Sequence, residues 1–237
     1  MKNKKMILGI AIIVMALVSA CGSKANPQSD FEVRNIDGDK SVEITGYIGT
    51  TQNVTIPSKI RGLPVTSIGE TAFRGKNLTS VTIPDSVIEI GEMAFIDNQL
   101  TSVTIPDSVT VIKQEAFAFN QLTSITIPSG ITEIWFGVFR DNQLTSVTIS
   151  DSVTAIEGVA FSGNQLTSVT IPNSVTSIGH QAFEYNNQLT SITIGASVLL
   201  ESSPFSGVGF ESAYNDGGKL AGTYTRPDPS STAWARQ

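Results

Sequence analysis

Few residues of this sequence could perform covalent chemistry. Cys21 is the only cysteine and His180 is the only histidine. A histidine-based triad would need a nucleophile and an acid beside His180, and the surrounding sequence suggests neither, so we interpret it as a surface histidine. No cluster of side chains has the spacing of a metal site, and we expect no cofactor.

Paired carboxylates are the remaining catalytic possibility, because a glycosidase needs two of them facing each other across its substrate. Glu89 and Glu133 occupy one register of the repeat described below, but they lie two units apart with Val111 between them. We therefore predict that the protein is not an enzyme.

Cys21 suggests a different use. Three lysines among the first five residues precede the apolar run Met6–Val18. This run is shorter than the roughly 20 residues that span a bilayer and is typical of a secretory signal. The string Leu17-Val18-Ser19-Ala20-Cys21 resembles a bacterial lipobox, in which the cysteine becomes the lipid-modified first residue. The resemblance predicts a signal peptide at 1–20 and a lipidated tether at 21–30; the alternative is an ordinary signal peptide cleaved nearby.

The charge balance restricts the partners. The formal net charge is −6, and removal of residues 1–20 takes away three lysines and no acidic residue. No basic run is present to neutralise phosphates, so we expect no nucleic-acid binding. Anionic lipid headgroups should repel the chain, which leaves the lipid anchor as the only membrane contact. A single cysteine allows no internal disulfide, so stability must come from packing.

An internal repeat defines the elements that would position any site. The string Gln-Leu-Thr-Ser-Val/Ile-Thr-Ile recurs every 22 or 23 residues, and a variant of it precedes the regular copies. The leucines of the string are Leu78 in the variant and then Leu100, Leu122, Leu144, Leu166 and Leu189. This period is typical of solenoids, in which stacked coils bury a face that one coil cannot bury alone.

One unit shows how a coil is built. After Leu100, apolar residues alternate with Ser102 and Thr104, as a half-buried strand requires. Pro106 ends the strand because it lacks a backbone donor, and a second short apolar segment follows at 109–112. We predict a β-rich leucine-rich-repeat solenoid of stacked coils. A parallel sheet should form one face, with a short second strand and a turn on the other.

Stacking places equivalent residues above one another, at a strand spacing of about 4.7–4.9 Å. We therefore expect two continuous columns inside the solenoid. The first is an aromatic spine of Phe73, Phe95, Phe117, Phe139, Phe161 and Phe183. The second is a ladder of amides that bond to the backbone, made of Asn98, Asn120, Asn142, Asn164 and either Asn186 or Asn187.

The unit Leu-Thr-Ser-Val-Thr-Ile-Pro-Asp-Ser-Val-Thr-x-Ile-x-x-x-Ala-Phe resembles the BspA-type class of leucine-rich repeats, which occurs on bacterial surface antigens. The resemblance covers about residues 42–205, including a slightly longer first coil. Such units often carry a cysteine where this chain has Asn98, so details of the inner ladder do not transfer. The resemblance implies a surface protein that binds other proteins.

Both ends of a solenoid expose apolar surface and strand edges, and therefore need covers. We predict a cap at 31–53, repeats at 54–205, and a second cap with a tail at 206–237. A hairpin should turn at Asp37-Gly38, since the further ligands of a calcium loop are missing.

The second cap has its own pattern. Phe210 and Tyr214 lie one helical turn apart and could pack on the last coil. The run Ala221–Arg226 could form a closing strand. The last eleven residues are expected to be loose, unless Trp234 folds back.

The outward residues of the first strand form a candidate binding face, rich in hydroxyl groups. Solenoid curvature makes such a face an extended binding surface, although β-propensity alone also selects threonine. Its members are Thr82, Thr104, Thr126, Thr148, Thr170, Thr193, Ser102, Ser124 and Ser146.

Departures from the repeat suggest a second candidate site. Trp135 and Phe136 replace the Gly-Glu or Gly-His of other coils, while Phe119 and Tyr185 share a register that elsewhere holds aspartate or glycine. These four residues are a candidate aromatic patch; local repacking is the alternative interpretation.

Three functions fit these patterns. The first, implied by the family resemblance, is an adhesin or interaction scaffold for an extracellular or cell-surface protein, such as a host matrix protein. The alternatives are an envelope spacer without a specific receptor, and binding of an ordered surface or polysaccharide through the Ser/Thr rows. We expect a monomer, exported and lipid-anchored to the outer surface of a bacterial envelope.

Overall fold

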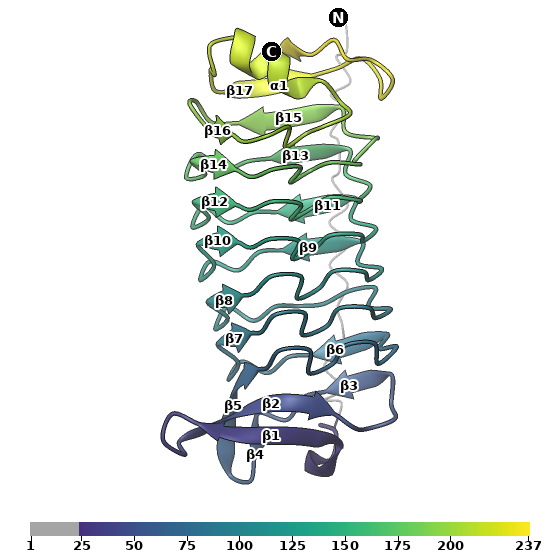
Figure 1. Cartoon of the computed structure of the whole chain (residues 1–237), viewed down its shortest axis with the longest axis vertical. Coiled ribbons are helices and arrows are strands. Elements are labelled where there is room, and N and C mark those ends of the chain that lie inside the picture. The colour runs from purple at the N-terminus through teal and green to yellow at the C-terminus, as the bar shows by residue number, and fades with distance from the viewer. Residues whose placement is uncertain (1–23) are drawn as a thin grey trace, which may run out of the picture.

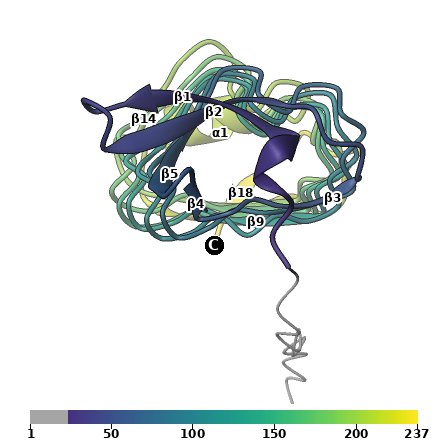
Figure 2. The same cartoon turned by 90° about the horizontal axis from the view of Figure 1, so that it is seen from below.

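The computed structural model describes residues 24–237, which form a solenoid of stacked coils (Figure 1). An N-terminal hairpin covers one end, and a short helix with two C-terminal strands covers the other. Seen along the axis, the coils superpose as one flattened ring (Figure 2). The predicted leucine-rich-repeat solenoid is confirmed.

Each regular coil carries up to two short strands, separated by a turn that contains proline in most coils. The first-strand series alternates outward Ser and Thr with inward Val and Ile, and comprises β3 (Asn53–Thr55), β6 (Ser80–Thr82), β9 (Ser124–Thr126), β11 (Ser146–Thr148), β13 (Ser168–Thr170) and β15 (Ser191–Ile194). The second-strand series comprises β5 (Leu63–Ile68), β7 (Glu89–Ile90), β8 (Val111–Ile112), β10 (Glu133–Ile134), β12 (Ala155–Ile156), β14 (Ser177–Ile178) and β16 (Leu199–Leu200).

Neighbouring coils pair in parallel and in register, but neither sheet runs the whole length. First strands pair only as β3–β6, β9–β11 and β13–β15. Second strands form one run from β5 through β7 to β8, and another from β10 through β12 and β14 to β16. The face predicted as one parallel sheet is therefore interrupted.

The spacing of the core rings accounts for only one of these interruptions. The phenylalanine rings of successive coils stack nearly parallel, with centroids 4.9–5.8 Å apart. The widest spacing, 5.8 Å between Phe117 and Phe139, lies at the interface where neither ladder is closed. The next widest, 5.6 Å between Phe139 and Phe161, nevertheless lies at an interface where both ladders are closed.

The predicted aromatic spine is confirmed and is longer than expected. Rings stack from Phe73 through to Phe183, and Phe205 adds one more at 4.9 Å. Tyr47 begins the column, 5.5 Å from Phe73. The spine therefore joins the first coil to the C-terminal cap.

The asparagine ladder is also confirmed. In one coil, Asn98 Oδ1 accepts the N–H of Leu78 at 2.9 Å, and Asn98 Nδ2 donates to the carbonyls of Phe73 and Phe95 at 2.8 and 3.0 Å. After the single-residue insertion, Asn186 takes this place. Each amide thus satisfies buried backbone groups of its own coil and of the coil before it.

The N-terminal cap is an antiparallel hairpin of β1 (Phe31–Ile36) and β2 (Ser41–Tyr47), which turns at Asp37-Gly38 as predicted. Asp37 accepts a hydrogen bond from the Ser41 hydroxyl at 2.6 Å, which supports a turn rather than a calcium loop. Strand β2 continues into the second-strand sheet by pairing with β5. The short β4 (Lys59–Ile60) pairs antiparallel with β5.

Part of the predicted tether belongs to this cap. Asn26 exchanges backbone and side-chain hydrogen bonds with Thr55, and a 3-10 helix, η1 (Gln28–Asp30), follows. The chain therefore packs against the first coil from Asn26 onward.

The C-terminal cap contains α1 (Phe210–Asp216), which ends at Gly217. Phe210 and Tyr214 are buried, and the Tyr214 hydroxyl donates to Gly195 O at 2.8 Å. Strand β17 (Gly222–Thr225) pairs antiparallel with β15, which confirms the closing strand.

The last residues are less loose than predicted. Strand β18 (Ala235–Arg236) pairs with β17. Trp234 Nε1 donates to Val208 O at 2.7 Å, and its ring lies against Phe210. Aromatic packing thus draws the tail back onto the cap.

Candidate functional site

The residues first considered for chemistry do not assemble into a catalytic site. His180 is exposed, and its Nδ1 lies 2.8 Å from Ser202 O. Between residues 24 and 237, no group of three His, Cys, Asp or Glu could hold a metal ion. The predicted signal peptide and Cys21 lie outside the described residues, within which no helix is long and apolar enough to cross a membrane.

The hydroxyl-rich face is exposed along most of its length. Val81, Ile125 and Val169 point inward and are buried, while the serine and threonine on either side of each are exposed. The exposed members of the predicted face are Thr82, Thr104, Thr126, Thr148, Thr170, Ser102, Ser124 and Ser146.

Thr193 is an exception, because the C-terminal cap closes this end of the face. It pairs with Thr223 of β17, and the two hydroxyl oxygens lie 2.9 Å apart. The available threonine row therefore ends at Thr170, which sequence reasoning missed because the closing strand comes from outside the repeat.

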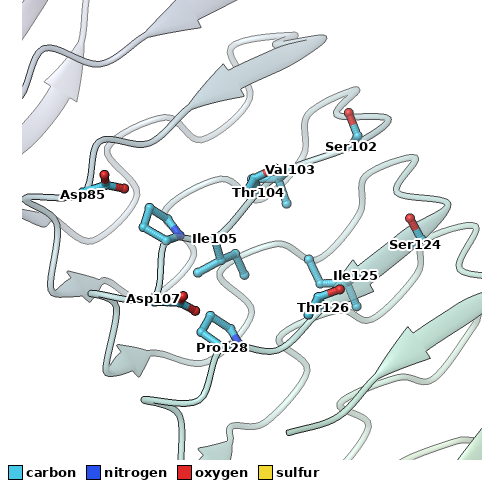
Figure 3. A pocket seen from close by; sticks show the side chains of 11 residues that line it. Asp85, Ser102, Val103, Thr104, Ile105, Asp107, Ser124, Ile125, Thr126 and Pro128 are labelled. Atoms are coloured by element: carbon cyan, nitrogen blue, oxygen red, sulfur yellow. The ribbon is translucent and has the colours of Figure 1, made fainter. Parts of the chain in front are cut away.

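The middle of the face is hollowed on both sides of Ser102–Thr104. A hollow of about 580 Å³ separates this segment from β9, and another of about 400 Å³ separates it from β6. Figure 3 shows Asp85 and Asp107 at one end of the larger hollow and Ser102 and Ser124 at the other.

The segment between the hollows has free backbone groups. Ser102–Thr104 is not part of any strand and makes no hydrogen bond to another residue of the described chain. Its peptide groups, the nearby hydroxyls and two carboxylates could bind a polar partner. A regular array is what an ordered surface would need, so this interruption argues against that alternative.

The structure does not gather the predicted aromatic patch into one site, and Phe119 and Tyr185 themselves lie three coils apart. Phe119 and Tyr185 occupy a column of left-handed backbone, with φ of 54° and 59°, where other coils have Gly75 or Asp97. The Arg140 guanidinium lies 5.2 Å from the Phe119 ring centroid. No ring contact within residues 24–237 joins this pair to Trp135 or Phe136.

Trp135 and Phe136 follow directly after β10 and remain 40 and 45% exposed. The Phe136 ring lies over Gly158 of the next coil, where it comes within 3.3 Å of the place a Cβ would occupy. Repacking therefore accounts for part of each ring, and the rest faces solvent.

Two carboxylates border this pair. Strand alternation points Glu133 and Trp135 to the same side, and pairing of β10 with β12 sets Glu157 across from Trp135. Glu133 and Glu157 are therefore diagonal neighbours across the β10–β12 pair, and burial followed by the charge of Glu133 raises the pKa of Glu157.

This carboxylate pair was not predicted from the sequence, because only residues at equivalent positions of successive coils were compared. Glu133 and Glu157 belong to different registers of adjacent coils, and the diagonal between neighbouring strands brings them together. Glu157 lies two residues after the position that is equivalent to Glu133 in the next coil, and this offset was the available signal in the sequence.

Comparisons with known proteins agree with this architecture. The family model of the BspA-type leucine-rich repeat region, in 6 copies, matches residues 47–165 and 111–213. No curated protein matches the chain.

Three solved structures are similar. A leucine rich cell surface protein from Faecalibacterium prausnitzii has 33% identity and a TM-score of 0.56, over 72% of this chain and 54% of its own. The leucine rich repeat protein of T. pallidum has 25% identity and a TM-score of 0.50, over 76% of this chain and 82% of its own. The pneumococcal vaccine antigen PcpA has 23% identity and a TM-score of 0.58, over 70% of this chain and 48% of its own. This similarity supports the fold alone.

This chain thus spans about half the length of the first and third of these proteins. The family model nevertheless extends over more than half of the chain, and the repeat units that it matches are the coils of the solenoid. The chain belongs to the BspA-type leucine-rich repeat family of bacterial surface proteins.

Proposed function

We propose that this protein is a lipid-anchored surface protein that acts as an adhesin or interaction scaffold for an extracellular or host matrix protein. The family and the surface location of the F. prausnitzii relative support this function. The anchor is Cys21, whose lipobox-like context would hold the mature chain to the bacterial envelope.

The observation that carries the proposal is the exposed hydroxyl face with its central hollows. Most of its serines and threonines pack against nothing, and the backbone at Ser102–Thr104 is free to bond a partner. A face made mainly of hydroxyl and peptide groups binds by hydrogen bonding and shape, so its interaction should survive raised salt, which screens nonspecific charge attraction.

The first experiment is a binding screen of residues 24–237 against immobilised extracellular matrix proteins and bacterial polysaccharides. The test variant changes Thr104, Thr126 and Thr148 to lysine, and all three are exposed on the hydroxyl face. The matched control changes Thr110, Thr132 and Thr154 to lysine, which adds the same charge beside the second strands.

A saturable interaction with a matrix protein, lost in the first variant and kept in the control, supports an adhesin and locates its face. Equal loss in both folded variants would contradict the assignment of this face. Absence of any partner would favour the envelope spacer.

The anchor needs its own test, since it is independent of the binding face. Cys21→Ser in the full chain should move the protein from the membrane fraction into the soluble fraction of the producing bacterium. Retention of the variant in the membrane would contradict lipid anchoring through Cys21.

A further inference from the structure

The aromatic pair Trp135–Phe136 interrupts a ladder that other coils keep. In neighbouring coils, the residue in the Trp135 register donates its N–H to the preceding coil, as Lys113 does to Ile90 O at 2.9 Å and Glu157 to Ile134 O at 2.8 Å. The Trp135 N–H makes no such bond to the described chain, and β8 and β10 are not paired.

This arrangement is costly for a purely structural role. Two large rings remain about two-fifths exposed to water, at a place where strand pairing is also lost. Exposed aromatic residues at a locally weakened position are a feature of binding sites, because the partner restores the burial that the free protein lacks.

Charge around the pair is unevenly balanced. Toward the N-terminal end of the same face, Glu43 is paired with Arg34, and Glu89 with Lys113 at 2.6 Å. Toward the C-terminal end, Glu133, Glu157 and Glu201 form no ion pair with any residue of the described chain. Glu133 and Glu157 are instead diagonal neighbours on β10 and β12, beside the exposed indole.

From these observations we infer that Trp135, Phe136, Glu133 and Glu157 form a docking site for a basic segment of a partner protein, one with arginine or lysine next to an apolar residue. This inference rests on the proposed scaffold function and names the chemistry of one partner segment. A cation placed there would pair with both carboxylates and lie over the indole ring. The neighbouring apolar side chain would cover Phe136.

A neutral sugar is the other ligand that stacks on an exposed indole. It would leave the two carboxylates facing each other without a counter-charge, so the charge distribution favours the cationic segment. The acidic surface excludes a nucleic-acid partner on the same grounds.

The test uses the full mature chain with Trp234→Phe, which leaves Trp135 as the only fluorophore of its kind. The probe is a synthetic nonapeptide of alternating arginine and leucine, with blocked ends. Peptides of alternating arginine and serine, and of alternating glutamate and leucine, serve as comparisons.

We expect saturable quenching of Trp135 by the arginine–leucine peptide, with binding roughly tenfold tighter than for either comparison peptide, about the effect of one added favourable contact. Glu133→Gln with Glu157→Gln should weaken that binding by about tenfold. The matched control, Glu70→Gln with Glu92→Gln, removes two carboxylates from the same side of the solenoid without an aromatic neighbour and should change little.

Calorimetry then tests the rings, since fluorescence is lost with the indole. Trp135→Ala with Phe136→Ala should abolish binding, while Tyr185→Ala, another exposed aromatic, should not. Equal binding of the arginine–serine peptide, equal weakening in the Glu70/Glu92 control, or tighter binding of a neutral oligosaccharide would each overturn the inference.

Failure here is distinguishable from failure of the scaffold function. A partner that is lost with the threonine-to-lysine variant but unaffected by Trp135→Ala with Phe136→Ala would keep the proposed function and reject this site alone.

Discussion

Two neighbouring interfaces between coils differ although their sequences are similar. The central seam is the interface between the coil that begins at Leu100 and the coil that begins at Leu122. At this seam neither first strands nor second strands pair. At the next interface both do, through β9–β11 and β10–β12.

Other bonds hold the central seam together. Phe117 and Phe119 donate their N–H groups to Val138 O and Arg140 O, each at 3.0 Å, and Asn142 Nδ2 donates to Phe117 O at 3.0 Å. These contacts lie on the turn side of the ring, away from both strand sides. Gln121 and Thr123 also donate their N–H groups to Leu100 O and Thr101 O, at 2.9 and 3.3 Å. The coils are therefore joined on the turn side and as far as Thr101, while Ser102–Thr104 and the second strands are unpaired across the seam.

The sequence of the coil after the seam departs from the repeat in two further places. Gly130 stands where Ser108 and Ser152 donate to the preceding coil, to Val87 O and Ile131 O at 2.7 Å. Val138 replaces the alanine found at positions 116 and 160. A missing hydroxyl and a larger core residue both fit the widest ring spacing, 5.8 Å between Phe117 and Phe139.

The comparison shows that stacked side chains do not by themselves close a β-ladder. Ser80–Thr82 and Ser102–Thr104 have the same sequence, yet only the first is a strand. The neighbouring coil decides whether such a segment forms a strand, because a strand exists only with a partner at the right distance.

The largest effect is expected from removing a ring of the spine. Phe161→Ala should lower the free energy of unfolding by about 3–5 kcal/mol, because a buried ring leaves a cavity between two close neighbours. Phe139→Ala borders the seam and should lie at the lower end of that range. Urea denaturation measures both, and a greater loss at Phe139 would contradict the weaker packing of the seam.

Replacing an asparagine of the ladder should change the unfolding transition differently at the two interfaces. Asn142→Ala and Asn164→Ala each leave buried backbone groups unpaired, at a cost of about 1–3 kcal/mol. Because Asn142 bridges the seam, its loss should also broaden unfolding or divide it into two steps, as nearest-neighbour coupling in a solenoid predicts. Asn164→Ala should keep one transition. Identical transition widths for the two variants, followed by circular dichroism, would argue against a seam.

Hydrogen exchange tests the missing strand directly. The Val103 amide should be protected about five- to tenfold less than the Ile125 amide, since one net hydrogen bond contributes about 1 kcal/mol. Equal protection would mean that Ser102–Thr104 pairs in solution as β9 does.

The smallest effect concerns the carboxylates beside the seam. Burial and the charges of Glu133 and Glu201 raise the pKa of Glu157 above its ordinary value of 4.5. The folded protein then binds the proton more tightly than the unfolded chain, so the ionised group lowers stability at neutral pH and this loss disappears as the pH falls below 4.5.

Glu157→Gln should therefore stabilise the protein at pH 7 by less than about 1 kcal/mol. The gain should vanish near pH 4. Denaturation at the two pH values checks the sign, and a variant less stable than the parent at pH 7 would contradict it.

Regular features of the molecule followed from the sequence because each coil repeats the one before it. The period indicated the solenoid, and the Phe73 and Asn98 registers indicated the spine and the ladder, since equivalent residues of stacked coils must meet. The turn at Asp37-Gly38 and the packing of Tyr214 were predicted from local chemistry alone.

The irregular features of the molecule could not be predicted from the sequence. Burial of Thr193 depends on β17, the meeting of Glu133 and Glu157 depends on a diagonal between strands, and the separation of Phe119 from Trp135 depends on the path of the turn. Each involves residues from different registers or from outside the repeat, which a column-by-column comparison cannot bring together.

The sequence by itself determined which side chains point inward and which residues stack, because both follow from period and polarity. Only the tertiary structure decided where the ladders close and where the surface is hollow. The reason is that strand pairing requires a spacing near 4.8 Å, while the spacing of coils is a compromise among all the side chains packed between them.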